Sequence, residues 1–191
     1  MTGRFVWYEQ MTTDTKAAIA FYSEVIGWKA EPFPSPQGGE PYNMWVASQG
    51  PLGGVMTLSE DAKKMGAPPH WMAHVEVDNV DSTIAQGKAK GGKVLVPPTD
   101  IPTVGRFSVF ADPQGAAISV FKSATEMQPH DTTKLGEVSW HELMTTDYEA
   151  GFEFYSELFG WEQMDEMDMG PAGKYRMFGQ GGSMYGGMMN K

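Results

Sequence analysis

The sequence predicts an α+β protein built from three successive βαβββ modules. Residues 3–28 and 136–161 align without a gap at an offset of 133, and a fainter match at an offset of 65 indicates a diverged copy at about 70–122. Self-similarity at a constant spacing indicates that one supersecondary unit has been repeated. We therefore expect modules at residues 3–58, 70–122 and 136–191.

The first module shows how each element is predicted. Aromatic and β-prone residues over 4–11 predict a strand. Thr13 or Asp14 is a good helix N-cap, and Gly27 suits the position after the helix. We expect the apolar stripe of this helix to be buried: Ala18, Phe21, Tyr22, Val25 and Ile26. Three β runs should follow, at Trp28–Phe33, Tyr42–Ser48 and Gly54–Leu58.

The other two modules repeat this order. In the second module we expect a strand at Met72–Glu76, a helix at Asp81–Lys90, and strands at Lys93–Val96, Gly105–Ala111 and Ala116–Lys122. Asp112-Pro113-Gln114-Gly115 predicts a tight turn before the last strand, because Pro restricts φ and Gly tolerates positive φ. The third module repeats the first, with a helix between Asp147 and Gly160.

Pairing of the modules predicts the domain organisation. Residues 1–122 would form one complete domain, 123–135 a polar linker and 136–191 half of a second domain. A half domain would expose a sheet face and strand edges, which is unfavourable in water. We therefore expect either a piece of a longer protein or a homodimer that pairs through residues 136–191.

Composition excludes several function classes. With 14 Lys and Arg against 24 Asp and Glu, the formal charge of −10 argues against a nucleic-acid partner. The absence of Cys excludes disulfides and thiolate chemistry. Apolar runs are too short for a membrane span, and the first residues do not resemble a secretory signal, so a cytoplasmic location is predicted.

Three features together carry a resemblance to a known family: Phe21-Tyr22 in the helix, Gly27-Trp28 after it, and the Asp112–Gly115 turn. A repeated βαβββ unit with these features resembles the vicinal oxygen chelate superfamily, which includes glyoxalases, bleomycin-resistance proteins and extradiol dioxygenases. The resemblance implies paired modules whose sheets curl into a cup. It also implies that any metal lies on the cup floor.

The ligand positions of that family carry unusual residues here. The resemblance places ligands at first-strand positions, here Trp7 and Met72, and in the last strand of the module, here Ser119. None of the three is a usual ligand for a hard divalent cation. The sequence therefore favours a protein without a conventional metal site and identifies no cofactor, while a divalent metal stays open as the alternative.

Strand alternation identifies the other candidate residues. In the second module, Met72, His74 and Glu76 should face the cup, and the offset of 65 makes Glu9 the counterpart of His74. A carboxylate and an imidazole in one cavity suit general acid/base catalysis, a partial metal site, ligand anchoring or a structural ion pair. Glu9 and His74 are thus the candidate catalytic pair, and the candidate ligand-binding residues are Trp7, Met72, Glu76, Arg106 and Ser119.

Two of these assignments have structural alternatives. Arg106 is the only cation expected near the cup, where it would bind a substrate carboxylate, but a surface role is as plausible. The aromatic residues Trp7, Trp45, Phe107 and Phe110 would line a ligand box or belong to the core.

Three functions follow from these residues. The favoured one is binding of a small organic molecule in an aromatic-lined cup, as in bleomycin-resistance proteins, with Glu9 and His74 as polar anchors. The alternative is a metal-dependent glyoxalase-like lyase or isomerase, or an extradiol-type dioxygenase, with a divalent metal on the displaced ligands Glu9 and His74. Glu76 is a further candidate ligand. A third is partner binding through the Met-rich stretch after Met164. Whether the protein is an enzyme stays open.

Overall fold

The computed structural model describes residues 2–34 and 42–191, which form two compact units. The module-one unit comprises Val6–His74 and Met127–Val138. The module-two-three unit comprises Met1–Phe5, Val75–Glu126 and Ser139–Lys191.

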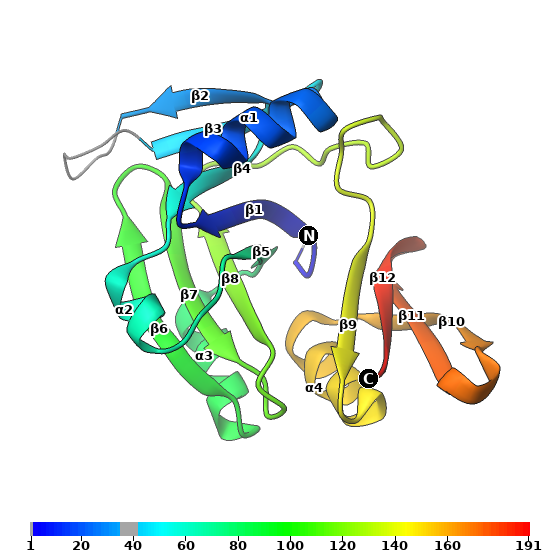
Figure 1. The fold of residues 1–191 in the computed structure, drawn as a ribbon. Coiled ribbons are helices and arrows are strands. Elements are labelled where there is room, and N and C mark those ends of the chain that lie inside the picture. The colour runs from blue at the N-terminus through cyan, green and yellow to red at the C-terminus, as the bar shows by residue number, and fades with distance from the viewer. Residues whose placement is uncertain (1, 35–41) are drawn as a thin grey trace. The chain divides into compact units, whose positions relative to one another are not determined.

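The module-one unit contains a helix on a mixed sheet. Its elements are β1 (Phe5–Thr12), α1 (Thr15–Val25), β2 (Lys29–Phe33), β3 (Tyr42–Ala47), β4 (Gly50–Thr57), α2 (Glu60–Lys64) and β5 (His70–Glu76), whose last two residues belong to the other unit. The strand order is β2-β3-β4-β1-β5, with β1 parallel to β4. Helix α1 lies along this sheet against β2 and β4 (Figure 1).

The module-two-three unit contains two groups of strands. The second module supplies α3 (Val80–Ala89), β6 (Lys93–Ile101), β7 (Gly105–Ala111) and β8 (Ala117–Ser123), in the strand order β8-β7-β6. The third supplies β9 (His141–Thr145), α4 (Tyr148–Phe159), β10 (Glu162–Asp168), the short 3-10 helix η1 (Gly170–Ala172), β11 (Lys174–Gln180) and β12 (Ser183–Asn190), in the order β10-β11-β12-β9. Helix α4 packs on β9 and β12 (Figure 1).

The predicted βαβββ order recurs in all three modules, so the predicted fold class is confirmed. Local signals worked as expected: Asp14 caps α1 by accepting from the Ala17 N–H at 2.9 Å, and Asp147 caps α4 in the same way. The predicted turn also forms, because Gly115 adopts a φ of 95°. Helices α2 and η1 were not predicted, since five and three residues carry too short a periodic pattern.

Each unit has its own core. Under α1, Trp28, Trp45, Leu52 and Val55 are buried together. In the other unit, aromatic residues of α4 pack with apolar residues of the second module. Its buried members include Val77, Val80, Ile84, Phe110, Phe154, Tyr155 and Phe159. The second and third modules therefore share one core, so the units do not follow the predicted segment boundaries. The prediction that 1–122 and 136–191 behave as separate domains stays a prediction.

Much of the predicted linker is held against the first module. Gln49 exchanges two hydrogen bonds with the Asp131 backbone, at 3.1 and 3.0 Å. The Trp28 indole N–H donates to the Gly136 carbonyl at 2.6 Å, and Val138 packs on the same core. Residues 127–138 are thus an integral part of the module-one unit.

The predicted burial of the α1 stripe is wrong for three residues. Phe21, Val25 and Ile26 are 57%, 64% and 40% exposed, whereas Tyr22 packs on the core. A stripe this wide needs more than one neighbour to cover it. Helix α4 has such a second neighbour in α3, which is why its equivalent stripe is buried.

None of the helices in the described ranges is long and apolar enough to cross a membrane. The cytoplasmic location stays a prediction.

Candidate functional site

Trp7, Tyr42 and Glu9 form a hydrogen-bonded chain in the module-one unit. The Trp7 indole N–H donates to the Tyr42 hydroxyl at 3.0 Å, and that hydroxyl donates to Glu9 Oε2 at 3.0 Å. The direction of this chain is settled by chemistry, because an indole nitrogen can only donate. The hydroxyl oxygen accepts from Trp7, so its hydrogen is directed to the carboxyl group.

Gly54 makes the chain possible. Strand β4 lies between β3 and β1, and both Met44 and Glu9 pair with Gly54 across it. A Cβ atom at Gly54 would overlap the Tyr42 hydroxyl and lie 2.7 Å from Glu9 Oε1. The bare backbone at this position therefore lets the Tyr42 ring cross β4 and reach Glu9.

Burial changes the acidity of Glu9. Glu9 is only 7% exposed. Burial raises the pKa of its carboxyl group to about 7, although the hydrogen bond from Tyr42 acts in the opposite direction. Within residues 2–34 and 42–191, Glu9 Oε1 has no hydrogen-bond partner. Because Oε2 already accepts from Tyr42, the proton of the neutral form is held on Oε1.

His74 and Met72 lie on β5, the strand next to β1. Met72 is buried, and burial lowers the pKa of His74 to about 4. His74 is therefore a neutral imidazole at pH 7. Since Glu9 ionises near pH 7 and His74 gains its charge near pH 4, these pKa values disfavour a structural Glu9–His74 ion pair.

The remaining predicted residues belong to the module-two-three unit, and each has a partner there. Glu76 forms an ion pair with Arg4 at 2.7 Å. Ser119 is fully buried and donates to the Ser108 carbonyl at 3.1 Å. Each of these side chains is thus engaged within its own unit.

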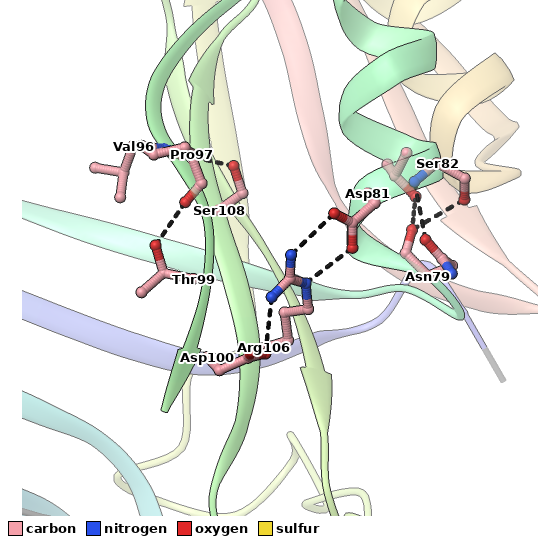
Figure 2. Close-up of polar contacts among 10 residues, drawn as sticks. Asn79, Asp81, Ser82, Val96, Pro97, Thr99, Asp100, Arg106 and Ser108 are labelled. Atoms are coloured by element: carbon pink, nitrogen blue, oxygen red, sulfur yellow. Dashed lines mark hydrogen bonds and ion pairs between the residues drawn. The ribbon is translucent and has the colours of Figure 1, made fainter. Parts of the chain in front are cut away.

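Arg106 is held by two carboxylates (Figure 2). It donates to both carboxylate oxygens of Asp81, at 2.8 and 2.9 Å, and to Asp100 at 2.8 Å. This arrangement links the start of α3 to β6 and β7. It corresponds to the structural alternative for Arg106 rather than to the binding of a substrate carboxylate.

The aromatic residues divide between core and site. Trp45 and Phe110 are almost fully buried in the two cores, as the core alternative predicted. The aromatic groups joined to Glu9 are Trp7 and Tyr42. Sequence reasoning missed Tyr42 as a site residue, although its recurrence as Tyr175 was the signal that could have found it.

The residues at the family's ligand positions do not suit a divalent cation. The Trp7 indole nitrogen only donates, the Met72 thioether is a soft ligand, and the Ser119 hydroxyl already donates to a backbone carbonyl. In the part of the chain that the structure describes, no three His, Cys, Asp or Glu side chains are grouped so as to hold a metal ion. The predicted and newly found site residues that hydrogen bonds bring together are Trp7, Tyr42 and Glu9.

Comparisons with known proteins agree with this fold. Residues 4–120 match the model of the Glyoxalase/Bleomycin resistance protein/Dioxygenase superfamily. The chain is 30% identical over 183 residues to the Mycobacterium tuberculosis (strain CDC 1551 / Oshkosh) protein named "Putative glyoxylase CFP32", covering 96% of this chain and 69% of that protein. It is 27% identical to the anthracycline biosynthesis protein DnrV of Streptomyces peucetius, covering 85% of this chain and 62% of DnrV.

Solved structures show the same fold at low identity. The Mn(II)-bound glyoxalase from Novosphingobium aromaticivorans is 14% identical with a TM-score of 0.65, and the match covers all of this chain and 62% of that one. A variant of 4-hydroxymandelate synthase from Streptomyces coelicolor is 15% identical with a TM-score of 0.69, covering 99% of this chain and 63% of that one. The chain thus spans less than two thirds of both structures.

Proposed function

Because the chain belongs to the glyoxalase/bleomycin resistance protein/dioxygenase superfamily, we propose that it binds a small organic molecule on the sheet face that carries Trp7, Glu9 and Tyr42. The observation that carries this proposal is Glu9 Oε1, a buried oxygen without a hydrogen-bond partner in the described ranges. A buried carboxylate oxygen without a hydrogen bond destabilises the folded protein, and a ligand donor that reaches ionised Glu9 would remove this cost. The names of CFP32 and DnrV also concern small-molecule chemistry.

The surroundings of Glu9 favour an aromatic alcohol as the ligand class. A ligand hydroxyl would donate to Glu9 Oε1 and supply the missing hydrogen bond. The ring would lie against Trp7 and the methionines of the same face, Met11, Met44 and Met56, because thioethers pack well on aromatic edges.

Glu9 would also hold the proton in any reaction at this site. A pKa of about 7 lets the carboxyl take and return a proton at neutral pH. The neutral imidazole of His74, one strand away, would be the second candidate for this role. We propose Glu9 as the proton acceptor and His74 as its auxiliary.

The metal-dependent alternative has less support. Glu76, the further candidate ligand beside Glu9 and His74, is already paired with Arg4 at 2.7 Å. We therefore expect ligand binding to survive extensive dialysis against EDTA. Elemental analysis of the undialysed protein and of Glu9→Ala would check this: a stoichiometric divalent metal that the variant loses would support the alternative.

Phenol is the simplest probe of the proposed site. In 15N-labelled protein, the indole N–H of Trp7 reports directly on the chain that ends at Glu9, and its signal can be assigned with Trp7→Phe. We expect phenol to shift this signal, and anisole, which lacks the hydroxyl donor, to bind about tenfold or more weakly.

The pH dependence of phenol binding tests whether Glu9 is the acceptor. Phenol affinity should rise between pH 6 and 8, because ionised Glu9 is the better acceptor and its pKa is about 7. Glu9→Gln should abolish this rise while keeping the shape of the side chain. Equal binding of phenol and anisole, or a pH profile unchanged in Glu9→Gln, would contradict the proposal.

A further inference from the structure

The hydrogen-bonded chain at Glu9 has a second copy in the third module. The Trp140 indole N–H donates to the Tyr175 hydroxyl at 2.7 Å, and that hydroxyl donates to Glu142 Oε2 at 3.1 Å. Each residue lies 133 positions after its counterpart in the first module. The direction of the chain is again settled by the indole donor.

The strand register that positions the chain is also repeated. Glu142 and Met177 both pair with Gly187, as Glu9 and Met44 both pair with Gly54. A Cβ at Gly187 would overlap the Tyr175 ring, so the same bare backbone lets the tyrosine cross the strand. The register shifts at the same place in both copies, between Trp45 and Val46 and between Phe178 and Gly179.

Four residues around the hydrogen-bonded chain are identical in the two modules: Met11/Met144, Met44/Met177, Gly54/Gly187 and Met56/Met189. Other positions of the sheet have changed. They include Tyr8/His141 and Gln10/Leu143 on the helix-packing face, and Glu31/Met164 and Phe33/Glu166 in the outer strand. The third module therefore keeps both the hydrogen-bonded chain and the methionines that lie beside it.

We infer that the third module carries a second binding site, formed by Trp140, Tyr175 and Glu142, for the same class of aromatic alcohol. This inference rests on the proposed function, since it assigns the ligand of Glu9 to Glu142 as well. The second site is more open: Trp140 is 41% and Met144 47% exposed, and Glu142 is exposed whereas Glu9 is buried. We therefore expect the same ligand to bind more weakly there.

The two sites can be observed separately in one experiment. The Trp7 indole N–H donates to Tyr42 and that of Trp140 donates to Tyr175. Phenol should therefore shift both indole signals, with a weaker affinity at Trp140. Assignment uses Trp7→Phe and Trp140→Phe. Glu142→Gln should weaken the response at Trp140 about tenfold and leave Trp7 unchanged, whereas Glu9→Gln should do the reverse. Anisole should bind about tenfold or more weakly than phenol at both sites.

The outcomes separate this inference from the proposed function. If Trp7 responds to phenol and Trp140 does not, the second site is refuted while the first stands. If Trp140 responds equally in wild type and Glu142→Gln, or equally to anisole, the response is not the inferred site and the inference also fails. If neither signal responds, both proposals fail. Tyr175→Phe, which keeps the ring over Gly187, provides a second variant that should weaken only the Trp140 response.

Discussion

Glu9 combines two properties that rarely occur in one carboxyl group: it is buried, and only one of its oxygens has a hydrogen-bond partner in the described ranges. Burial favours the neutral form, so the folded protein binds this proton more tightly than the unfolded chain does. A pKa of about 7 in the folded state, against an ordinary value of 4.5, makes the free energy of unfolding fall as pH rises from about 4.5 to 7.

This linkage predicts the effect of Glu9→Gln. The amide cannot ionise, so the variant should be more stable than the wild type at pH 8, with a difference about 2–3 kcal/mol larger than at pH 4.5. Urea denaturation at the two pH values measures it. Glu142→Gln, at an exposed side chain, is the matched control and should show no such change. A constant difference between Glu9→Gln and wild type would show that Glu9 has no raised pKa.

At the scale of elements, α1 and α4 show that one sequence pattern can be packed in two ways. Both helices begin at a capping Asp and carry Phe-Tyr at the same position. Phe154 of α4 is 5% exposed, whereas Phe21 of α1 is 57% exposed. The difference lies in the neighbours. Helix α4 packs against α3, and the ring centroid of Phe154 lies 6.1 Å from that of Phe110.

Alanine substitutions at this pair should therefore differ. Phe154→Ala should lower the free energy of unfolding by about 3–5 kcal/mol, because it leaves a cavity in a packed core. Phe21→Ala should change it by less than about 1 kcal/mol, because more than half of this residue is already exposed. Urea denaturation of both variants is the measurement, and equal losses would contradict the packing described for α1.

At the scale of the whole molecule, the second and third modules depend on each other. Besides the shared core, the turn of module two holds the start of α4: Gln114 Oε1 accepts from the Asp147 N–H at 2.6 Å, and its amide donates to the Asp147 carbonyl at 2.7 Å. The Tyr155 hydroxyl donates to Asp112 of the same turn at 3.0 Å. Removing the third module would therefore expose the apolar residues of the second module that α4 covers.

A chain truncated after Val138, which keeps residues 127–138 of the module-one unit, tests this dependence. We expect it to lose cooperative unfolding and to bind a hydrophobic dye, because Val80, Ile84 and Phe110 would lose their α4 partners. A truncated chain that unfolds cooperatively, with the stability of the full chain, would instead support residues 1–122 as an independent domain. Thermal unfolding followed by circular dichroism compares the two chains.

The predicted homodimer through residues 136–191 concerns the same module. In their sheets β1 lies between β4 and β5, whereas β9 ends the order β10-β11-β12-β9. We propose that β9 pairs with β9 of a second copy, in the way that β1 lies beside β5. An exposed edge strand is a template for such pairing. Light scattering should then give twice the 21.0 kDa of one chain, and a monomer at all concentrations would refute the pairing.

The sequence alone determined the features that depend on neighbouring residues. Three βαβββ modules, the capping role of Asp14 and the turn at Asp112–Gly115 follow from spacing and local backbone preference, and the structure confirms them. The residues of both hydrogen-bonded chains also recur in the repeat, but the repeat does not show that they contact one another. Glu9 itself was identified from strand alternation.

Only the tertiary structure decided which distant residues meet. The path of Tyr42 over Gly54 to Glu9 depends on the strand order β3-β4-β1, which sequence periodicity does not specify. The exposure of Phe21 depends on which element packs beside α1. Periodicity shows that a face is apolar, but burial requires a partner surface from elsewhere in the chain, and that partner is chosen by packing of the whole fold.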